Sequence, residues 1–133
     1  MADHPRHAAP NTRARDWTLP KAPGTLAVAR ALVREALAAW AWPDERVDDV
    51  VQVVSELVGN VLRHTSAEAQ LTLTPTADGV LIGVGDRAGH LLVLQRPPNA
   101  HGGYGLLLLD RLTDGWTIEE KSSGKHVYAH IRR

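Results

Sequence analysis

The sequence predicts an α+β fold, a two-layer sandwich in which about three helices cover one face of a mixed, mostly antiparallel sheet. Two long stretches repeat their apolar residues at helical spacing. Two pairs of shorter segments alternate apolar and polar residues on either side of a glycine-containing turn. The elements follow one another as strand, helix, helix, hairpin, loop, helix and hairpin, for which two layers are the economical arrangement.

Length and composition exclude several classes of protein. A chain of 133 residues is expected to be one domain, and 15 Lys and Arg balance 15 Asp and Glu. This balance gives no long-range attraction toward nucleic acid or an anionic membrane, so neither is expected as a direct partner. The absence of cysteine excludes disulfides, thiol catalysis and cysteine zinc sites. No apolar run is long enough to cross a bilayer or resembles a signal peptide, so we expect a cytoplasmic protein.

The first part of the chain predicts a tail, a strand and a helix. Residues 1–15 lack periodicity and are expected to form a disordered tail before a domain that spans residues 16–133. Trp17 to Leu19 is expected to form a short edge strand. A helix is predicted from Thr25, as its capping residue, to Trp40.

The stretch that organises the chain is the next helix, which is expected to follow Pro43 and Asp44 and to end near Thr65. Its apolar residues repeat at helical spacing over more than four turns: Val47, Val50, Val51, Val54, Leu57, Val58, Val61 and Leu62. Off this stripe lies a polar strip, Gln52, Glu56, Asn60 and Arg63, with His64 between the strip and the core. Taken alone, the strip is most often a solvated face.

Two features farther along the chain bear on this strip. A hairpin is predicted from residues 70–74 and 80–84, joined by Ala77-Asp78-Gly79. Its second strand runs into Asp86, where a carboxylate can contact a ligand or simply form a turn. After a predicted short strand at residues 91–94, the glycines of residues 102–105 precede a leucine-rich helix. Glycines at that place let backbone N–H groups approach an anion, although glycine-rich loops also have purely geometric causes.

The chain closes with a second predicted hairpin, formed by residues 116–120 and 126–131 around a turn at residues 122–124. Three features therefore occur in one order: Glu-x-x-x-Asn on a helix, Asp86 at a strand end and Gly-x-Gly at the start of a later helix. In this element order they resemble the Bergerat-fold ATP-binding domain of gyrase, heat-shock chaperones and sensor histidine kinases, the histidine-kinase-like ATPases.

Within that superfamily the chain is most similar to the anti-sigma-factor serine kinases. Residues 55–64, Ser-Glu-Leu-Val-Gly-Asn-Val-Leu-Arg-His, resemble the family's S-E-L-V-x-N-A-x-R-H box almost residue for residue. Residues 103–110 resemble its second glycine box, and residues 124–128 its closing strand. The resemblance covers about residues 16–131; the first box is specific, and the other two support it.

The resemblance implies a role for each candidate residue. Asn60 would bind Mg²⁺ through its side-chain oxygen, and Glu56 would act as general base. Arg63, with His64 beside it, would reach the phosphates of ATP, and Asp86 would accept from the adenine amino group. The glycine boxes would complete the ATP site with Gly89, Gly103, Tyr104 and Gly105.

Two positions depart from the family pattern. Ala88 replaces the first glycine of the D-x-G-x-G box, and His126 stands where related domains often place a threonine that helps hold adenine. Two hypotheses of different classes follow. In the first, the protein transfers the γ-phosphate of ATP to a serine or threonine of an anti-sigma-factor antagonist and sequesters a sigma factor. In the second, it is a non-catalytic nucleotide-binding or interaction module.

The retained Glu56 favours the enzyme, and the altered adenine box favours the module. A third and weaker hypothesis is a detached catalytic domain of a histidine kinase. The sequence shows no dimerisation helix or phosphoacceptor segment, which counts against this hypothesis. The sequence leaves a homodimer open.

Overall fold

The computed structural model describes residues 13–65, 67–86, 103–121 and 124–133, and for residues 103–106 and 121 it describes only the backbone. Within these residues it contains five strands and three helices. In chain order they are β1 (Arg15–Leu19), α1 (Thr25–Ala39), α2 (Asp44–His64), β2 (Ala69–Pro75), β3 (Gly79–Asp86), α3 (Gly103–Leu112), β4 (Gly115–Lys121) and β5 (Gly124–Arg132).

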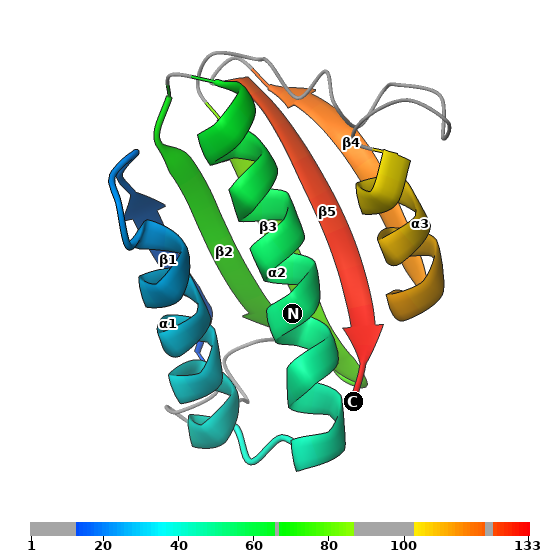
Figure 1. Cartoon of the computed structure of the whole chain (residues 1–133). Coiled ribbons are helices and arrows are strands. Elements are labelled where there is room, and N and C mark those ends of the chain that lie inside the picture. The colour runs from blue at the N-terminus through cyan, green and yellow to red at the C-terminus, as the bar shows by residue number, and fades with distance from the viewer. Residues whose placement is uncertain (1–12, 66, 87–102, 122–123) are drawn as a thin grey trace.

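The strands form one sheet in the order β1-β2-β3-β5-β4, and each described pair is antiparallel. The three helices lie side by side on one face of this sheet, with α2 between α1 and α3 (Figure 1). The predicted two-layer α+β sandwich is therefore confirmed. The sheet was expected to be mixed and mostly antiparallel, whereas the described pairs include no parallel one.

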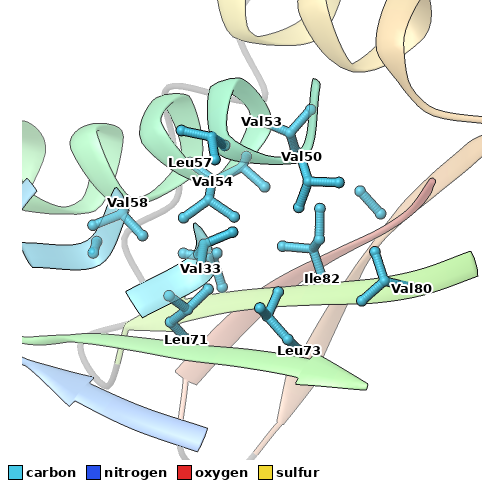
Figure 2. Close-up of a cluster of buried hydrophobic side chains, with 14 of the residues drawn as sticks. Val33, Val50, Val53, Val54, Leu57, Val58, Leu71, Leu73, Val80 and Ile82 are labelled. Carbon is cyan, nitrogen blue, oxygen red and sulfur yellow. The ribbon is translucent and has the colours of Figure 1, made fainter. Parts of the chain in front are cut away.

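The core lies between α2 and the central strands. Valines and leucines of α2 point toward Leu71, Leu73, Val80 and Ile82 on β2 and β3 (Figure 2). Valine is a mediocre helix former, so this packing holds α2 helical more than intrinsic propensity does. The ends of α2 also suit the helix dipole, with acidic residues in the first turn and basic residues in the last.

Several element boundaries differ from the prediction. Gly24, in a left-handed conformation with φ 83°, precedes α1, and Thr25 is the first helical residue. Its hydroxyl donates to the carbonyl of Pro20 instead of capping the helix. Arg15, expected in the tail, begins β1, and α3 begins at Gly103, so the glycines form its first turn instead of preceding it.

The predicted hairpins and the end of α2 agree with the structure to within about two residues. The strand predicted at residues 91–94 lies outside the described residues, as does the tail up to residue 12.

The arrangement brings three element ends to one end of the molecule. The last turn of α2, the last residues of β3 and the first turn of α3 lie there, near the start of β5 (Figure 1). We call this the box end. The opposite end, which we call the hairpin end, holds the first turn of α2, the turn between β2 and β3, the end of α3 and the end of β5.

Candidate functional site

The polar strip of α2 is less exposed than the sequence predicted. The side chain of Asn60 is only 1% exposed, although it was placed off the apolar stripe. Val53, two helical turns earlier on the same side of α2, is also fully buried. The buried face of α2 is therefore wider than the predicted stripe, because the helix packs on both α1 and α3 as well as on the sheet. The prediction that Asn60 lies outside the core is wrong.

Glu56, Asn60 and Arg63 nevertheless come together as the helical spacing predicted. The Arg63 Nη2 donates to Asn60 Oδ1 at 2.6 Å and lies 3.7 Å from Glu56 Oε2. The Glu56 side chain is 27% exposed and that of Arg63 is 56% exposed, so the strip passes from the interior to solvent. His64, the last residue of α2, is exposed.

The oxygen of the Asn60 side chain is the atom that accepts from Arg63, since a guanidinium group only donates. The amide nitrogen of Asn60 is buried and makes no hydrogen bond to the described residues. A buried amide with an unsatisfied donor normally costs about 1–3 kcal/mol of folding free energy. Such a group is more typical of a binding site than of a core.

Asp86 ends β3 and is completely buried. Its Cα partners are Ala69 on β2 and Lys125 on β5. Directly opposed residues of antiparallel strands lie on the same face of a sheet, so Asp86 and Lys125 share the face that the helices cover. The structure thus places Asp86 at the end of a strand, as the sequence predicted, and on the face that the helices cover.

His126 lies on the other face of the sheet. It is paired with Gly85, and a Cβ atom on Gly85 would come within 2.3 Å of the His126 ring. The ring therefore lies against the bare backbone of β3, stacked with Tyr128 at a centroid distance of 6.2 Å. The residue of β5 that faces the same side as Asp86 is Lys125, and the expectation that His126 takes the threonine's place beside adenine is wrong.

Sequence reasoning missed Lys125. Its side chain is 19% exposed, and its Nζ lies 3.6 Å from Glu120 Oε2. The signal was available, because Val127, Ala129 and Ile131 mark the core-facing positions of β5 and Lys125 continues their alternation.

The glycine boxes are described only in part. Gly103, Tyr104 and Gly105 form the first turn of α3, at the box end of the molecule (Figure 1). The first N–H groups of a helix have no intrahelical acceptor and favour anions. Ala88 and Gly89 lie outside the described residues.

A pocket of about 440 Å³ opens beside the strip. It is lined by residues of all three helices: Leu26, Arg30, Gln52, Ser55, Glu56, Arg63 and Leu108. Arg30 on α1 donates to the Ser55 hydroxyl on α2 at 2.9 Å, which fixes one wall. The pocket gives Glu56 and Arg63 access to a bound molecule, and its α1 wall was not predicted from the sequence.

The side-chain oxygens at this site suit a metal ion that is coordinated mainly by a bound substrate and by water. No group of three or more His, Asp or Glu side chains gathers around a common point in the described part of the chain. Mg²⁺ usually keeps several waters and takes one or two protein oxygens together with substrate phosphates. Asn60 Oδ1, already in contact with a cationic group, is an oxygen of that kind.

None of the described helices is both long and apolar enough to cross a membrane.

Comparison with known proteins agrees with this geometry. The family model described as histidine kinase-like ATPase domain matches residues 19–131. The chain belongs to this family. Membership implies ATP binding, which in this family generally depends on Mg²⁺. A search of curated proteins finds no match.

Two solved structures share the fold of this ATPase domain. One shows the RsbU and RsbW domains of Rv1364c from Mycobacterium tuberculosis, with a TM-score of 0.70 and 22% identity over 91% of this chain. This chain covers only 32% of that longer protein. The other is the SiaB–SiaC complex from Pseudomonas aeruginosa, with a TM-score of 0.70, 16% identity and 90% of each chain covered. At these identities the likeness shows the fold alone.

Proposed function

We propose that this protein is a cytoplasmic, Mg²⁺-dependent kinase that transfers the γ-phosphate of ATP to a serine or threonine of an anti-sigma-factor antagonist and thereby controls a sigma factor. The observation that carries the proposal is the strip of α2, where Arg63 contacts both Asn60 and Glu56 beside an open pocket. Binding of the sigma factor and formation of a homodimer are part of the proposal.

The strip supplies the groups that phosphoryl transfer needs. Bound Mg²⁺ would neutralise charge that develops on the phosphates, and Asn60 Oδ1 would be its protein ligand. Glu56 lies one turn earlier on the same side of α2 and lines the pocket, so its carboxylate could accept the proton of an entering hydroxyl. Arg63 is half exposed and its long side chain can reach phosphate oxygens.

The nucleotide would be oriented from the other elements at the box end. Asp86 would accept from the adenine amino group at the end of β3. The backbone N–H groups of Gly103 and Gly105, with Tyr104 between them, would hold the phosphates at the start of α3. His64 and Gly89 are the remaining residues of the proposed ATP site.

The second candidate is a non-catalytic module with the same fold. Lys125 is the specific observation in its favour, since a cation on the adenine side of the sheet is a poor substitute for a hydroxyl that can both donate and accept. Such a module would bind its partner through the same surfaces without transferring phosphate.

A calorimetric titration with ATP tests the proposal, performed with Mg²⁺ and again with a chelator. Wild type should bind more tightly with Mg²⁺, and Asn60→Ala should lose about tenfold or more of that Mg²⁺-dependent affinity, because a metal ligand contributes at least as much as the outer-shell groups that orient one. The chelator arm is the internal control, since both proteins should then bind alike. Equal Mg²⁺-dependent affinities in two folded proteins would rule out Asn60 as the ligand.

A further inference from the structure

The position of Arg63 carries an inference about how the site is kept at rest. One guanidinium nitrogen, Nη2, contacts the two oxygens that the proposed function assigns to metal ligation and base catalysis, Asn60 Oδ1 at 2.6 Å and Glu56 Oε2 at 3.7 Å. A positively charged nitrogen between an amide oxygen and a carboxylate occupies the place that a bound cation would take. The arginine that is expected to reach the phosphates is therefore turned back onto its own helix.

Gly59 makes this position of Arg63 available. A Cβ atom at residue 59 would lie 2.9 Å from Arg63 Nη1 and 3.7 Å from its Cζ, so the guanidinium group lies against the bare backbone of α2. Glycine inside a helix costs about 1 kcal/mol relative to alanine, and residue 59 is buried in the middle of α2 without a positive φ that would require glycine. The close approach of Arg63 is the reason for glycine that the structure offers.

We infer that Arg63 is an internal cation that occupies Asn60 and Glu56 until Mg²⁺ and nucleotide displace it, and that Gly59 is the positioning residue that permits this resting state. The inference rests on the proposed function. Binding then requires the guanidinium group to leave Asn60 Oδ1, after which it can turn outward to the phosphates. Part of the affinity for Mg²⁺ and ATP is lost in breaking the resting contact, and Glu56 stays paired while no metal is present.

The Gly59→Ala variant tests this directly. The added methyl group meets the end of the flexible Arg63 side chain and lies at an ordinary contact distance, 3.8 Å, from Leu26 Cδ2, so the helix should tolerate it and gain stability from alanine. With Arg63 displaced, affinity for ATP in the presence of Mg²⁺ should rise about two- to fivefold, the effect of removing one half-exposed ionic contact. Gly115→Ala is the matched control, because a Cβ at residue 115 meets nothing within 4 Å and lies away from the strip.

A double-mutant cycle separates the resting contact from a general effect on the helix. In an Arg63→Ala background, Gly59→Ala should change the affinity no more than the control does, because the side chain it displaces is gone. Equal or weaker binding by Gly59→Ala in a folded protein, or the same gain in both backgrounds, would overturn the inference.

A measurement without nucleotide keeps this test independent of the proposed function. The side-chain amide signals of Asn60, identified in NMR spectra with Asn60→Ala, should shift in Gly59→Ala and in Arg63→Ala and stay in place in Gly115→Ala. Unshifted signals in the first two variants would show that Arg63 does not rest on Asn60. If wild type binds no ATP in calorimetry, the proposed function fails, whereas the NMR result still decides whether the resting contact exists.

Discussion

Polar side chains are hydrogen-bonded more completely at the hairpin end of the molecule than at the box end. At the hairpin end, His130 joins two turns: its Nδ1 lies 3.0 Å from both carboxylate oxygens of Asp114, and its Nε2 lies 2.8 Å from the Thr76 hydroxyl. Arg46, in the first turn of α2, donates to the carbonyl of Arg132 and to Asp49. The contacts of His130 and the contact of Arg46 with Arg132 tie separate segments of the fold together, and the Arg46–Asp49 pair lies within α2.

At the box end the same helix carries polar groups whose pairing is incomplete, although Arg63 donates to Asn60 Oδ1. Arg63 is half exposed and 3.7 Å from Glu56, and the Asn60 amide nitrogen has no hydrogen-bond acceptor among the described residues. Unsatisfied buried groups reduce stability, and proteins keep them mainly where a ligand will satisfy them. The hairpin end therefore stabilises the fold, and the box end is suited to binding a ligand. Changes at one end should therefore alter binding and catalysis, and changes at the other should alter stability.

The largest expected effect is at the box end, from Glu56→Gln. The amide keeps the size and hydrogen-bonding capacity of the side chain but removes its negative charge and most of its basicity. Loss of a general base lowers a rate by about 10²–10⁴-fold. Radiolabelled phosphate transfer to candidate antagonists should fall by that factor, while calorimetry should show ATP binding that persists or strengthens as repulsion from the phosphates is relieved.

The matched control for this variant is Glu35→Gln, the same chemical change at an exposed position of α1. It should leave both transfer and binding unchanged. Transfer by Glu56→Gln at the wild-type rate would remove Glu56 from the mechanism. A wild-type protein that binds ATP and transfers phosphate to no antagonist would instead favour the non-catalytic module.

At the hairpin end, Asp114→Asn should lower stability by about 0.5–1 kcal/mol, the range of a partly exposed ion pair, and lower the Tm by about 2–5 °C. ATP affinity should not change, because Asp114 follows the end of α3, which lies at the hairpin end of the molecule (Figure 1). Thermal unfolding and calorimetry on the same sample provide the measurement. A loss of ATP affinity without a loss of stability would contradict the division of roles between the two ends.

The effect of Asp114 should also depend on pH. Burial alone raises the pKa of its carboxyl, but hydrogen bonds from the His130 side chain and its own backbone, and the charges of His130 and Arg132, outweigh this and leave the pKa below its ordinary value. A carboxyl with a lowered pKa stabilises the fold above its unfolded pKa of about 3.9, and this contribution disappears as the pH falls through the folded pKa. The Tm difference between wild type and Asp114→Asn should have its full size at neutral pH and become smaller below about pH 4.

Periodicity was sufficient to predict most of the fold. The helical repeat of valines and leucines located α2, and the alternating segments around Gly79 and Gly124 located both hairpins, because apolar burial is a local property of each element. The antiparallel order of the five strands could not be read from the chain in the same way. It depends on which strands meet in space.

The site was predictable where its residues share one helix and less so where they come from separate elements. Spacing alone brought Glu56, Asn60 and Arg63 together, whereas the burial of Asn60 depends on the elements that pack on α2, namely α1, α3 and the sheet. Strand register decides that Lys125, and not His126, faces the same side of the sheet as Asp86, because a shift of one residue moves every side chain to the other face. Tertiary packing and strand register therefore determine the burial and the facing of site residues, which helical spacing alone does not predict.

Lys125 gives the smallest expected effect and the sharpest test of the box end as a ligand site. Its register opposite Asp86 places Lys125 on the face from which adenine would be read, where its ammonium group, 3.6 Å from Glu120 Oε2, would compete with the adenine amino group for the carboxylate. Opposite charges directly across two strands interact by about 0.2–1 kcal/mol, so Lys125→Thr should raise ATP affinity by about 1.4- to 5-fold.

Lys125→Met separates charge from size, because it keeps the length of the side chain and removes the ammonium. If charge is responsible, both variants should bind ATP more tightly, and both should discriminate more strongly against GTP, since the lysine can donate to the carbonyl that guanine carries in place of the amino group. Competition between ATP and GTP for wild type and both variants measures this. A gain in ATP affinity by Lys125→Thr alone would show that the size of the side chain is responsible. Weaker ATP binding by both variants would mean that Lys125 contacts the nucleotide favourably. In that last case the box end of this chain would read its base with a cation as well as with Asp86.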